Sequence, residues 1–253
     1  MKRAEGHPSS IRANDLGSQR KVQNVTLLSD ISEQIRNDIA SGRIELGDRL
    51  TIDDLSIRYG ASHMPVREAL RRLAGEGLVA MEPGRGARVR EVDRDFVANL
   101  FDTRNALEAV LAGGAARHCT PADADQLSAV EVERKELVER GDFAGALRLN
   151  RRFHSLIHRL GANPQARELI DRTSVLIVAL WHRYGYGPER FAGVASDHHN
   201  LIRALRANDT NAAAILAGAH ALKAKFDLLA QMDLEARPAA VRSVRRALAR
   251  AED

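Results

Sequence analysis

Cysteine and aromatic residues are scarce in this sequence of 253 residues. It contains a single cysteine, Cys119, and only 4% aromatic residues. One cysteine excludes an internal disulfide and is typical of a reducing compartment. The longest apolar runs, such as VLIVAL at 175–180, are far shorter than the roughly 20 residues of a membrane-spanning helix, and no signal peptide is recognisable. We therefore expect a cytoplasmic protein without a membrane segment.

The residues that are abundant favour helices. Apolar residues make up 44% of the chain, only seven residues are proline, and alanine, leucine and arginine recur throughout. The length suits two domains, each with its own core. The formal net charge is only +4, so a surface that binds nucleic acid would have to be local. The composition predicts a mostly α-helical protein of two domains.

Changes of pattern along the chain predict four segments. The first residues mix glycine, proline, serine and charge without an apolar period, which is typical of a flexible arm. Helical periodicity begins at Val25, and after Asp93 the pattern indicates six helices without an internal repeat. The last residues fit either a short amphipathic helix or a loose end. The predicted segments are an arm over 1–23, a first domain over 24–92, a helical bundle over 93–231 and a tail over 232–253.

Within the first domain, residues 51–92 have the order helix, glycine turn, helix and two extended runs. Thr51 is placed to cap a short helix that Gly60 ends, and a further helix opens at Ser62 with its apolar residues on one face. The extended runs that flank Pro83–Gly86 predict a two-stranded wing. This order of elements indicates a winged helix-turn-helix.

The helix that opens at Ser62 has the residue types of a DNA-reading helix. Such a helix needs short polar groups in its N-terminal turn and arginines in the turns that follow, and a wing needs little side-chain bulk at its tip. The candidate contacts are Ser62, His63, Arg67, Arg71, Gly84 and Arg85. A cationic surface helix of an enzyme could carry the same arginines, so these residues alone leave both interpretations open.

The run LGDRLTIDDLSIRYGASHMPVREALRRLAGEGLVAMEPGRGARV resembles the winged helix-turn-helix of the GntR family of bacterial transcription regulators. A PVREAL-x-RL-x3-GL core followed by a glycine-tipped wing carries the resemblance. It implies that the candidate residues of the second helix and of the wing contact DNA. His63 stands where an arginine is usual, and Asp53 stands where some members place a DNA-contacting arginine. The resemblance therefore leaves the base preference open.

Three of the nine histidines are spaced so that helices could bring them together. Asn150 and His154 are four residues apart on one predicted helix and share a face. His198 and His220 lie about equally far before and after a turn at 207–210, which puts them at the same level of an antiparallel helix pair. Three helices could thus bring three imidazoles and one amide oxygen to one point.

The segments LNRRFH, DHHNLIRAL and NAAAILAGAHAL resemble the three ligand-bearing helices of the FCD domain, the C-terminal ligand-binding bundle of the FadR subfamily within GntR. This resemblance implies that Asn150, His154, His198 and His220 bind a divalent metal ion; zinc, nickel or manganese suits imidazole with oxygen. Many members have aspartate in place of Asn150. Neutral ligands leave the ion its charge of +2, which attracts an anion. Protonation of the imidazoles below about pH 6 would release the ion.

Arg104 and Glu108 are one turn apart on the first predicted helix of the bundle. As an exposed ion pair they would contribute only a few tenths of a kcal/mol. The FCD resemblance implies instead that Arg104 binds a carboxylate effector whose other oxygens reach the metal. A guanidinium fork and a divalent ion that face one cavity select small organic acids. The sequence leaves both interpretations open.

Together these patterns predict a transcription regulator and not an enzyme. We expect a homodimer that binds double-stranded operator DNA, acts as a repressor, associates with the nucleoid when bound and responds to a small organic acid. The alternative is a metal-dependent hydrolase with an accessory DNA-binding domain, but Asp197 is the only carboxylate beside the ligand motifs that could act as a general base. An architectural DNA-binding protein without an effector would leave the histidine set unexplained.

Overall fold

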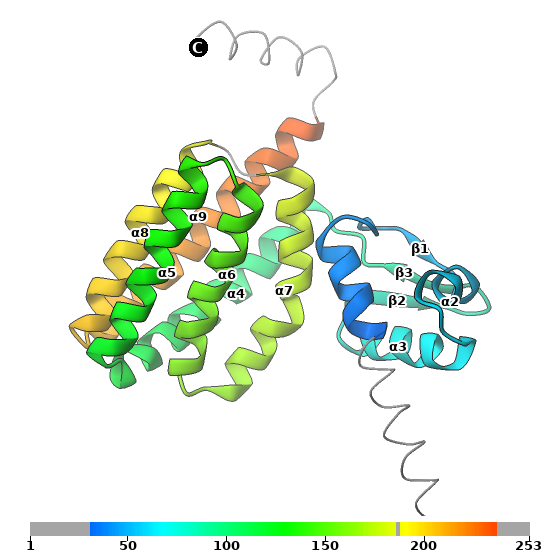
Figure 1. Cartoon of the computed structure of the whole chain (residues 1–253), viewed down its shortest axis with the longest axis horizontal. Coiled ribbons are helices and arrows are strands. Elements are labelled where there is room, and N and C mark those ends of the chain that lie inside the picture. Colours follow the sequence, from blue (N-terminus) through cyan, green and yellow to red (C-terminus); the bar gives the residue numbers. More distant parts are fainter. Residues whose placement is uncertain (1–30, 186–187, 237–253) are drawn as a thin grey trace, which may run out of the picture. The chain divides into compact units, whose positions relative to one another are not determined.

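The computed structural model describes residues 31–185 and 188–236. Contacts divide the chain into two compact units, Met1–Glu91 and Val92–Asp253. Helices dominate both units, and the only sheet in the described residues belongs to the N-terminal unit (Figure 1). The prediction of a mostly α protein with a winged N-terminal domain and an all-α C-terminal bundle is confirmed.

The N-terminal unit is a helix-turn-helix followed by a wing. Its elements are a helix over residues 31–40, β1 (Arg49–Leu50), α2 (Ile52–Tyr59), α3 (His63–Gly75), β2 (Val79–Glu82) and β3 (Gly86–Val89). The strands are antiparallel in the order β1-β3-β2. The predicted two-stranded wing corresponds to β2 and β3, and β1 adds a third strand. With two residues, β1 is too short to produce an alternating pattern, and it forms because Leu50 pairs with Ala87 of β3.

Local signals determine where α2 and α3 begin and end. The Thr51 hydroxyl accepts the backbone N–H of Asp54 at the start of α2, and Gly60 ends the helix with a φ of 61°, in the left-handed region. After Ser62, α3 buries one apolar face and leaves its arginines exposed. The buried residues of α3 are Val66, Ala69, Leu70 and Leu73.

The wing turn depends on two glycines for different reasons. Gly86 has a φ of 93°, and a Cβ at this position would clash with the carbonyl oxygen of Leu50 in β1. Gly84 has a φ of 70°, but no atom would crowd a Cβ there. Packing and backbone conformation therefore both require glycine at position 86, whereas backbone conformation alone favours it at position 84.

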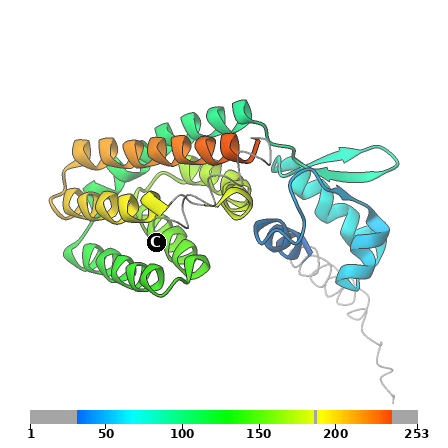
Figure 2. The ribbon, with the colours of Figure 1, turned by 90° about the horizontal axis from the view of Figure 1, so that it is seen from above.

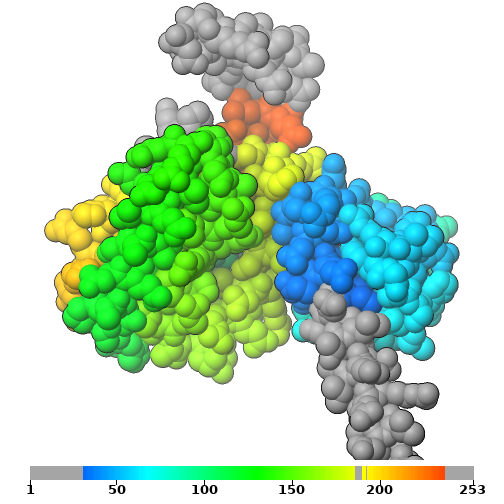
Figure 3. Space-filling model, viewed as in Figure 1, coloured from blue at the N-terminus to red at the C-terminus, as the bar shows by residue number. Residues whose placement is uncertain are grey.

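The C-terminal unit is a bundle of helices, and its described part contains six of them, as predicted. They are α4 (Arg94–His118), α5 (Pro121–Glu139), α6 (Phe143–Leu160), α7 (Pro164–Tyr184), α8 (Pro188–Arg206) and α9 (Thr210–Ala236). α4 and α9 lie side by side and form the most extensive helix contact (Figure 2). α5 packs against both α6 and α8. On the face of this unit drawn in Figure 3, side chains of α5, α6 and α7 form most of the surface.

The end of α9 lies farther along the chain than the predicted end of the bundle. The helix continues to Ala236 and so takes up the first residues of the predicted tail over 232–253. Asp233 lies 3.2 Å from Arg94 of α4, so this last turn still contacts the bundle. The predicted arm and the rest of the tail lie outside the described residues. In the ranges that are described, no helix is long and apolar enough to span a membrane.

Candidate functional site

On the N-terminal unit, α3 and the wing enclose a groove of about 490 Å³. Basic side chains from β1, α3 and the wing turn line it, and two carboxylates lie among them. The basic residues are Arg49, His63, Arg67, Arg71 and Arg85, and the acidic ones are Asp53 and Glu82. Five of the six residues predicted to contact DNA line this groove, and Ser62 lines an adjoining hollow together with His63.

Several donors in the groove have no partner within the described part of the protein. Arg67 and Arg85 form no side-chain ion pair with any described residue. Ser62 precedes α3 as its N-cap, but its hydroxyl makes no capping hydrogen bond. Arg71 differs, because its guanidinium pairs with Glu68 on the same helix. The groove therefore offers hydrogen-bond donors to phosphate oxygens and base edges.

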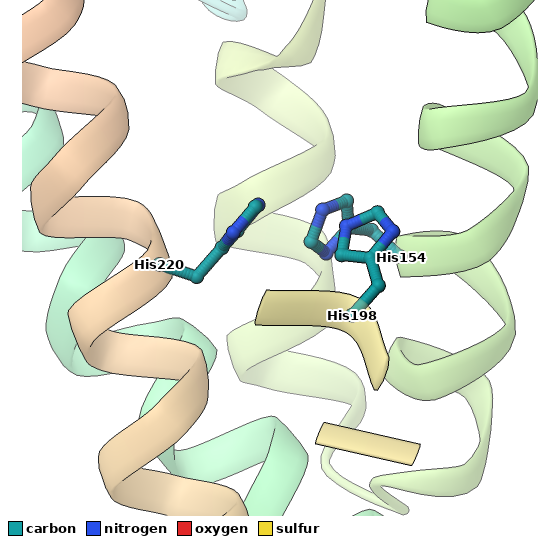
Figure 4. A group of neighbouring side chains, drawn as sticks. All are labelled: His154, His198 and His220. Atoms are coloured by element: carbon teal, nitrogen blue, oxygen red, sulfur yellow. The ribbon is translucent and has the colours of Figure 1, made fainter. Parts of the chain in front are cut away.

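In the C-terminal unit, three imidazoles from three helices converge on one point (Figure 4). His154 comes from α6, His198 from α8 and His220 from α9. Their ring centroids lie 5.0–5.2 Å apart, and one ring nitrogen of each lies within 4.8 Å of the others. The equal spacing of His198 and His220 from the α8–α9 turn thus brings them to one level, as the sequence predicts.

Carboxylates hold two of these imidazoles in a defined tautomer. His198 donates its Nδ1–H to Glu131 of α5 over 2.6 Å, and His220 donates its Nδ1–H to Asp197 over 3.1 Å. An ionised carboxylate only accepts hydrogen bonds, so Nε2 of each imidazole keeps its lone pair. The guanidinium of Arg134, on the same helix as Glu131, donates two hydrogen bonds of 2.7 and 2.8 Å to the Glu131 carboxylate. This is the arrangement by which proteins orient histidines toward a metal ion.

Burial sets the protonation states at this centre. It lowers the pKa of His198 to about 4, although the hydrogen bond to Glu131 opposes the change. Burial also lowers the pKa of His154 and of His220. Burial alone would raise the pKa of Glu131, but its hydrogen bonds with Arg134 and His198 hold it below its usual value. Three neutral imidazoles and an ionised supporting carboxylate are the protonation states that metal binding requires.

The donor set fits a divalent cation. His198 is completely buried, and its Nε2 has no hydrogen-bond partner among the described residues. An unpaired buried acceptor costs free energy, and a cation bound there would remove this cost. Asn150 lines the same cavity as His154 and His220. The predicted ligands are therefore gathered in one place, with neutral donors that suit zinc, nickel or manganese.

A cavity of about 70 Å³ adjoins the imidazoles. Its polar lining consists of Arg104, Glu108, Asn150, His154, Arg190 and His220, and the apolar lining includes Trp181. Arg104 and Glu108 form an ion pair of 2.8 Å, with side chains only 15% and 6% exposed. The interpretation of this pair as an exposed surface contact is therefore wrong. Arg104 Nη1 is buried without a hydrogen-bond partner among the described residues, which leaves it available to a ligand.

A third carboxylate and imidazole pair lies at the cavity wall. His158 of α6 contacts Glu108 of α4 over 2.7 Å, and both side chains are buried. Burial would raise the pKa of Glu108, but the charges of Arg104 and His158 and the hydrogen bond from His158 keep it well below its usual value. Glu108 therefore stays ionised and holds Arg104 at the cavity wall.

Comparison with known proteins identifies both units. Residues 27–89 match the bacterial regulatory proteins of the gntR family, and residues 99–223 match the FCD domain. The chain belongs to the GntR family. The FCD domain agrees with the FadR subfamily within GntR. As a GntR-family member, the protein is a DNA-binding transcription regulator, and nothing in the comparisons favours the hydrolase alternative.

Individual relatives agree with the GntR assignment. The chain is 26% identical over 198 residues to the HTH-type transcriptional regulator McbR of Escherichia coli K12, which covers 75% of this chain and 86% of McbR. It is 29% identical to the HTH-type transcriptional repressor RspR of the same strain over 143 residues. This match covers 56% of this chain and 63% of RspR. The solved structure of E. coli McbR/YncC has the same fold, with a TM-score of 0.71 and 24% identity over 81% of this chain and 98% of that one.

The sequence of this GntR regulator does not predict all the contacts around the three imidazoles. Glu131 reaches His198 only because α5 packs against α8, and spacing along the chain does not predict this contact. Arg190 enters the cavity from the start of α8, with Nη2 3.5 Å from Nε2 of His220. Asp197 is noticeable in the sequence because it directly precedes His198, but its hydrogen-bond partner is His220 of the next helix.

Proposed function

We propose that this GntR regulator is a repressor whose operator affinity changes when a small carboxylate binds beside a divalent cation in its FCD bundle. The observation that carries the proposal is the convergence of three neutral imidazoles beside a cavity lined by Arg104. One of these imidazoles has a buried Nε2 without a hydrogen-bond partner among the described residues. FCD domains of some family members bind metals. The known relatives RspR and a probable D-xylose utilization operon regulator of Paenarthrobacter nicotinovorans are named as repressors.

In this proposal His154, His198 and His220 hold the cation, and Asn150 supplies an amide oxygen. The cation would contribute positive charge that attracts and orients an anion. The protein contributes the fixed tautomers of His198 and His220 through Glu131 and Asp197. None of these ligands is anionic, so the site retains its preference for an anionic partner.

The effector is proposed to be a small organic acid, such as a hydroxy acid or a sugar acid. Arg104 Nη1 is the donor that would receive its carboxylate, because it is buried and has no partner among the described residues. The cavity of about 70 Å³ limits the part of the ligand that enters without rearrangement. An apolar cavity of about 150 Å³ accommodates benzene, so this one admits only a carboxylate and a few neighbouring atoms.

The helix that carries Arg104 offers a route from the cavity to the DNA-binding unit. α4 begins at Arg94, and the last strand of the wing ends at Val89. Arg104 and Glu108 form an ion pair within α4, and Glu108 also contacts His158 of α6, so a ligand that recruits Arg104 would disturb a contact that links α4 to α6. A shift of α4 would reach the wing through a short connection.

DNA binding is proposed to use Ser62, His63, Arg67, Arg71, Gly84 and Arg85, with α3 in the major groove and the wing against the backbone. One recognition helix reads few base pairs, so we propose a homodimer that binds two half-sites related by a two-fold axis. Sedimentation at micromolar concentration, with and without DNA, tests this assembly. A monomer under both conditions would contradict it.

The effector proposal is tested on a DNA duplex that the full-length protein selects from a random library. Affinity for this duplex is measured with metal-loaded and chelator-treated protein, in the presence of a panel of hydroxy acids and sugar acids. We expect at least one acid to raise the melting temperature of the metal-loaded protein and to change its DNA affinity. Absence of metal uptake, or no response to any acid, would contradict the proposal.

Arg104→Lys is the variant that tests the carboxylate contact. Lysine keeps a positive charge beside Glu108 but lacks the bidentate fork, so the response to the acid should weaken while metal content and DNA binding persist. Arg140→Lys is the matched control, because Arg140 also forms an i, i+4 ion pair with a glutamate, Glu136, but on the surface, where the side chains are 71% and 52% exposed. An unchanged response in Arg104→Lys would exclude Arg104 from the effector site.

A further inference from the structure

Two residues that depart from the GntR pattern contact one another at the edge of the DNA groove. Asp53 lies in the first turn of α2, and His63 is the first residue of α3. The Asp53 carboxylate lies 3.2 Å from Nε2 of His63. Both side chains are exposed and line the groove together with Arg67. The two departures are therefore physically coupled.

A carboxylate in a groove for DNA calls for an explanation, because it repels phosphate. One role available to Asp53 is a favourable interaction with the positive end of the α2 dipole. Asp54 in the same turn already has that role: its backbone N–H donates to Thr51 and its carboxylate accepts the Thr51 hydroxyl. Asp53 makes no part of this cap and instead reaches across the turn to His63.

The hydrogen bond to Asp53 determines what His63 can recognise. To donate to the carboxylate, Nε2 must carry the hydrogen, so the neutral ring keeps its lone pair on Nδ1. An acceptor recognises the exocyclic amino group of adenine or cytosine in the major groove, whereas an arginine at this position donates to guanine. The pair thus has the opposite hydrogen-bonding character to the arginine that is usual in the family.

We infer that Asp53 and His63 form one base-reading unit, in which Asp53 fixes the imidazole so that Nδ1 accepts a hydrogen bond from adenine or cytosine. This inference rests on the DNA contacts proposed above, with α3 in the major groove. It makes Asp53 a positioning residue that acts through His63. At one position of each half-site the protein then selects a base with an amino group in the major groove.

The test uses the full-length protein and duplexes with a randomised core, selected at pH 8 and fixed salt. The position read by His63 is the one whose preference changes in His63→Arg, and we expect a shift there from adenine or cytosine to guanine. Asp53→Asn keeps an oxygen that accepts the Nε2–H and should retain the wild-type preference. Asp53→Ala removes this acceptor and should reduce discrimination at that position by about fivefold.

The outcomes separate this inference from the proposed docking. An unchanged preference in Asp53→Ala, or selection of guanine by the wild-type protein at that position, would overturn the reading unit. Arg67→Ala serves as the docking control. If it binds the selected duplex as the wild type does, the proposed docking is wrong. If it loses binding while Asp53→Ala keeps its preference, only the Asp53–His63 inference fails. Because both side chains are exposed, thermal melts should match the wild type.

Discussion

Metal binding at the histidine centre should be unusually resistant to acid. An exposed imidazole with the ordinary pKa of about 6.5 is about 90% protonated at pH 5.5, and deprotonating it for a metal costs about 1.4 kcal/mol, or about tenfold in affinity. Three such imidazoles would weaken binding about a thousandfold between pH 7.5 and pH 5.5. The expectation that the ion leaves below about pH 6 assumes ordinary imidazoles of this kind.

Burial changes this expectation. The pKa of His198 is lowered to about 4, so only about 3% of this imidazole is protonated at pH 5.5 and the penalty is negligible. Burial lowers the pKa of His154 and His220 as well. We therefore expect affinity for zinc or nickel to fall by less than about tenfold between pH 7.5 and pH 5.5, and to fall steeply only at lower pH.

Calorimetric titration of chelator-treated protein measures this directly. Trp181, the only tryptophan of the chain, lines the cavity and provides a fluorescence signal for the same titration. Repeating the calorimetry in buffers of different ionisation enthalpy counts the released protons, and we expect fewer than about one per chain at pH 5.5. A thousandfold loss of affinity with release of about three protons would refute the reasoning.

The metal-free protein must stay folded in this assay. Imidazoles in the unfolded chain take up protons below about pH 6.5, while the buried His198 does not until about pH 4. The stability due to this difference is complete above pH 6.5 and is lost as the pH falls from there toward 4. Circular dichroism at each pH is therefore the control.

Four further variants test other parts of the structure. Gly86→Ala should strongly lower the melting temperature and abolish DNA binding, because its Cβ would clash with the carbonyl oxygen of Leu50; Gly84→Ala, with open space around its Cβ, should cost only about 1 kcal/mol in thermal unfolding. Equal melting temperatures would contradict the packing described for the wing. Arg67→Ala should lower the operator affinity by about 1–3 kcal/mol in gel shifts at fixed salt, and unchanged affinity would exclude the proposed docking. Glu131→Gln should weaken metal binding by about 10–100-fold in calorimetry, because it loosens the orientation of His198; wild-type affinity would mean that Glu131 has no such role.

The parts of the fold that the sequence predicts depend on local signals. Thr51 and Gly60 mark the ends of α2 because caps act over three or four residues. His198 and His220 lie opposite one another on neighbouring helices because they are equally far from the turn between them, and a short connection makes such helices antiparallel. In these cases the relevant contacts are close along the chain or are related by one turn.

The parts that the sequence does not predict depend on packing between distant segments. β1 exists only because β3 pairs with it, and its two residues contain no period of their own. The Arg104–Glu108 pair is buried inside the bundle, where His158 of another helix contacts Glu108. An i, i+4 spacing is the same for a surface pair and a buried one, so spacing alone could not separate the two interpretations.

The convergence of His154, His198 and His220 has a consequence for chain connectivity. A cation held by all three would close one loop that contains α7 and a second loop around the α8–α9 turn. A disulfide that closes loops of comparable length stabilises a protein by about 3–4 kcal/mol, mainly by restricting the unfolded chain. With Cys119 as its only cysteine, this chain cannot form such a bond internally. The ion would serve as a removable cross-link, and its loss would expose the bundle to local opening and proteolysis.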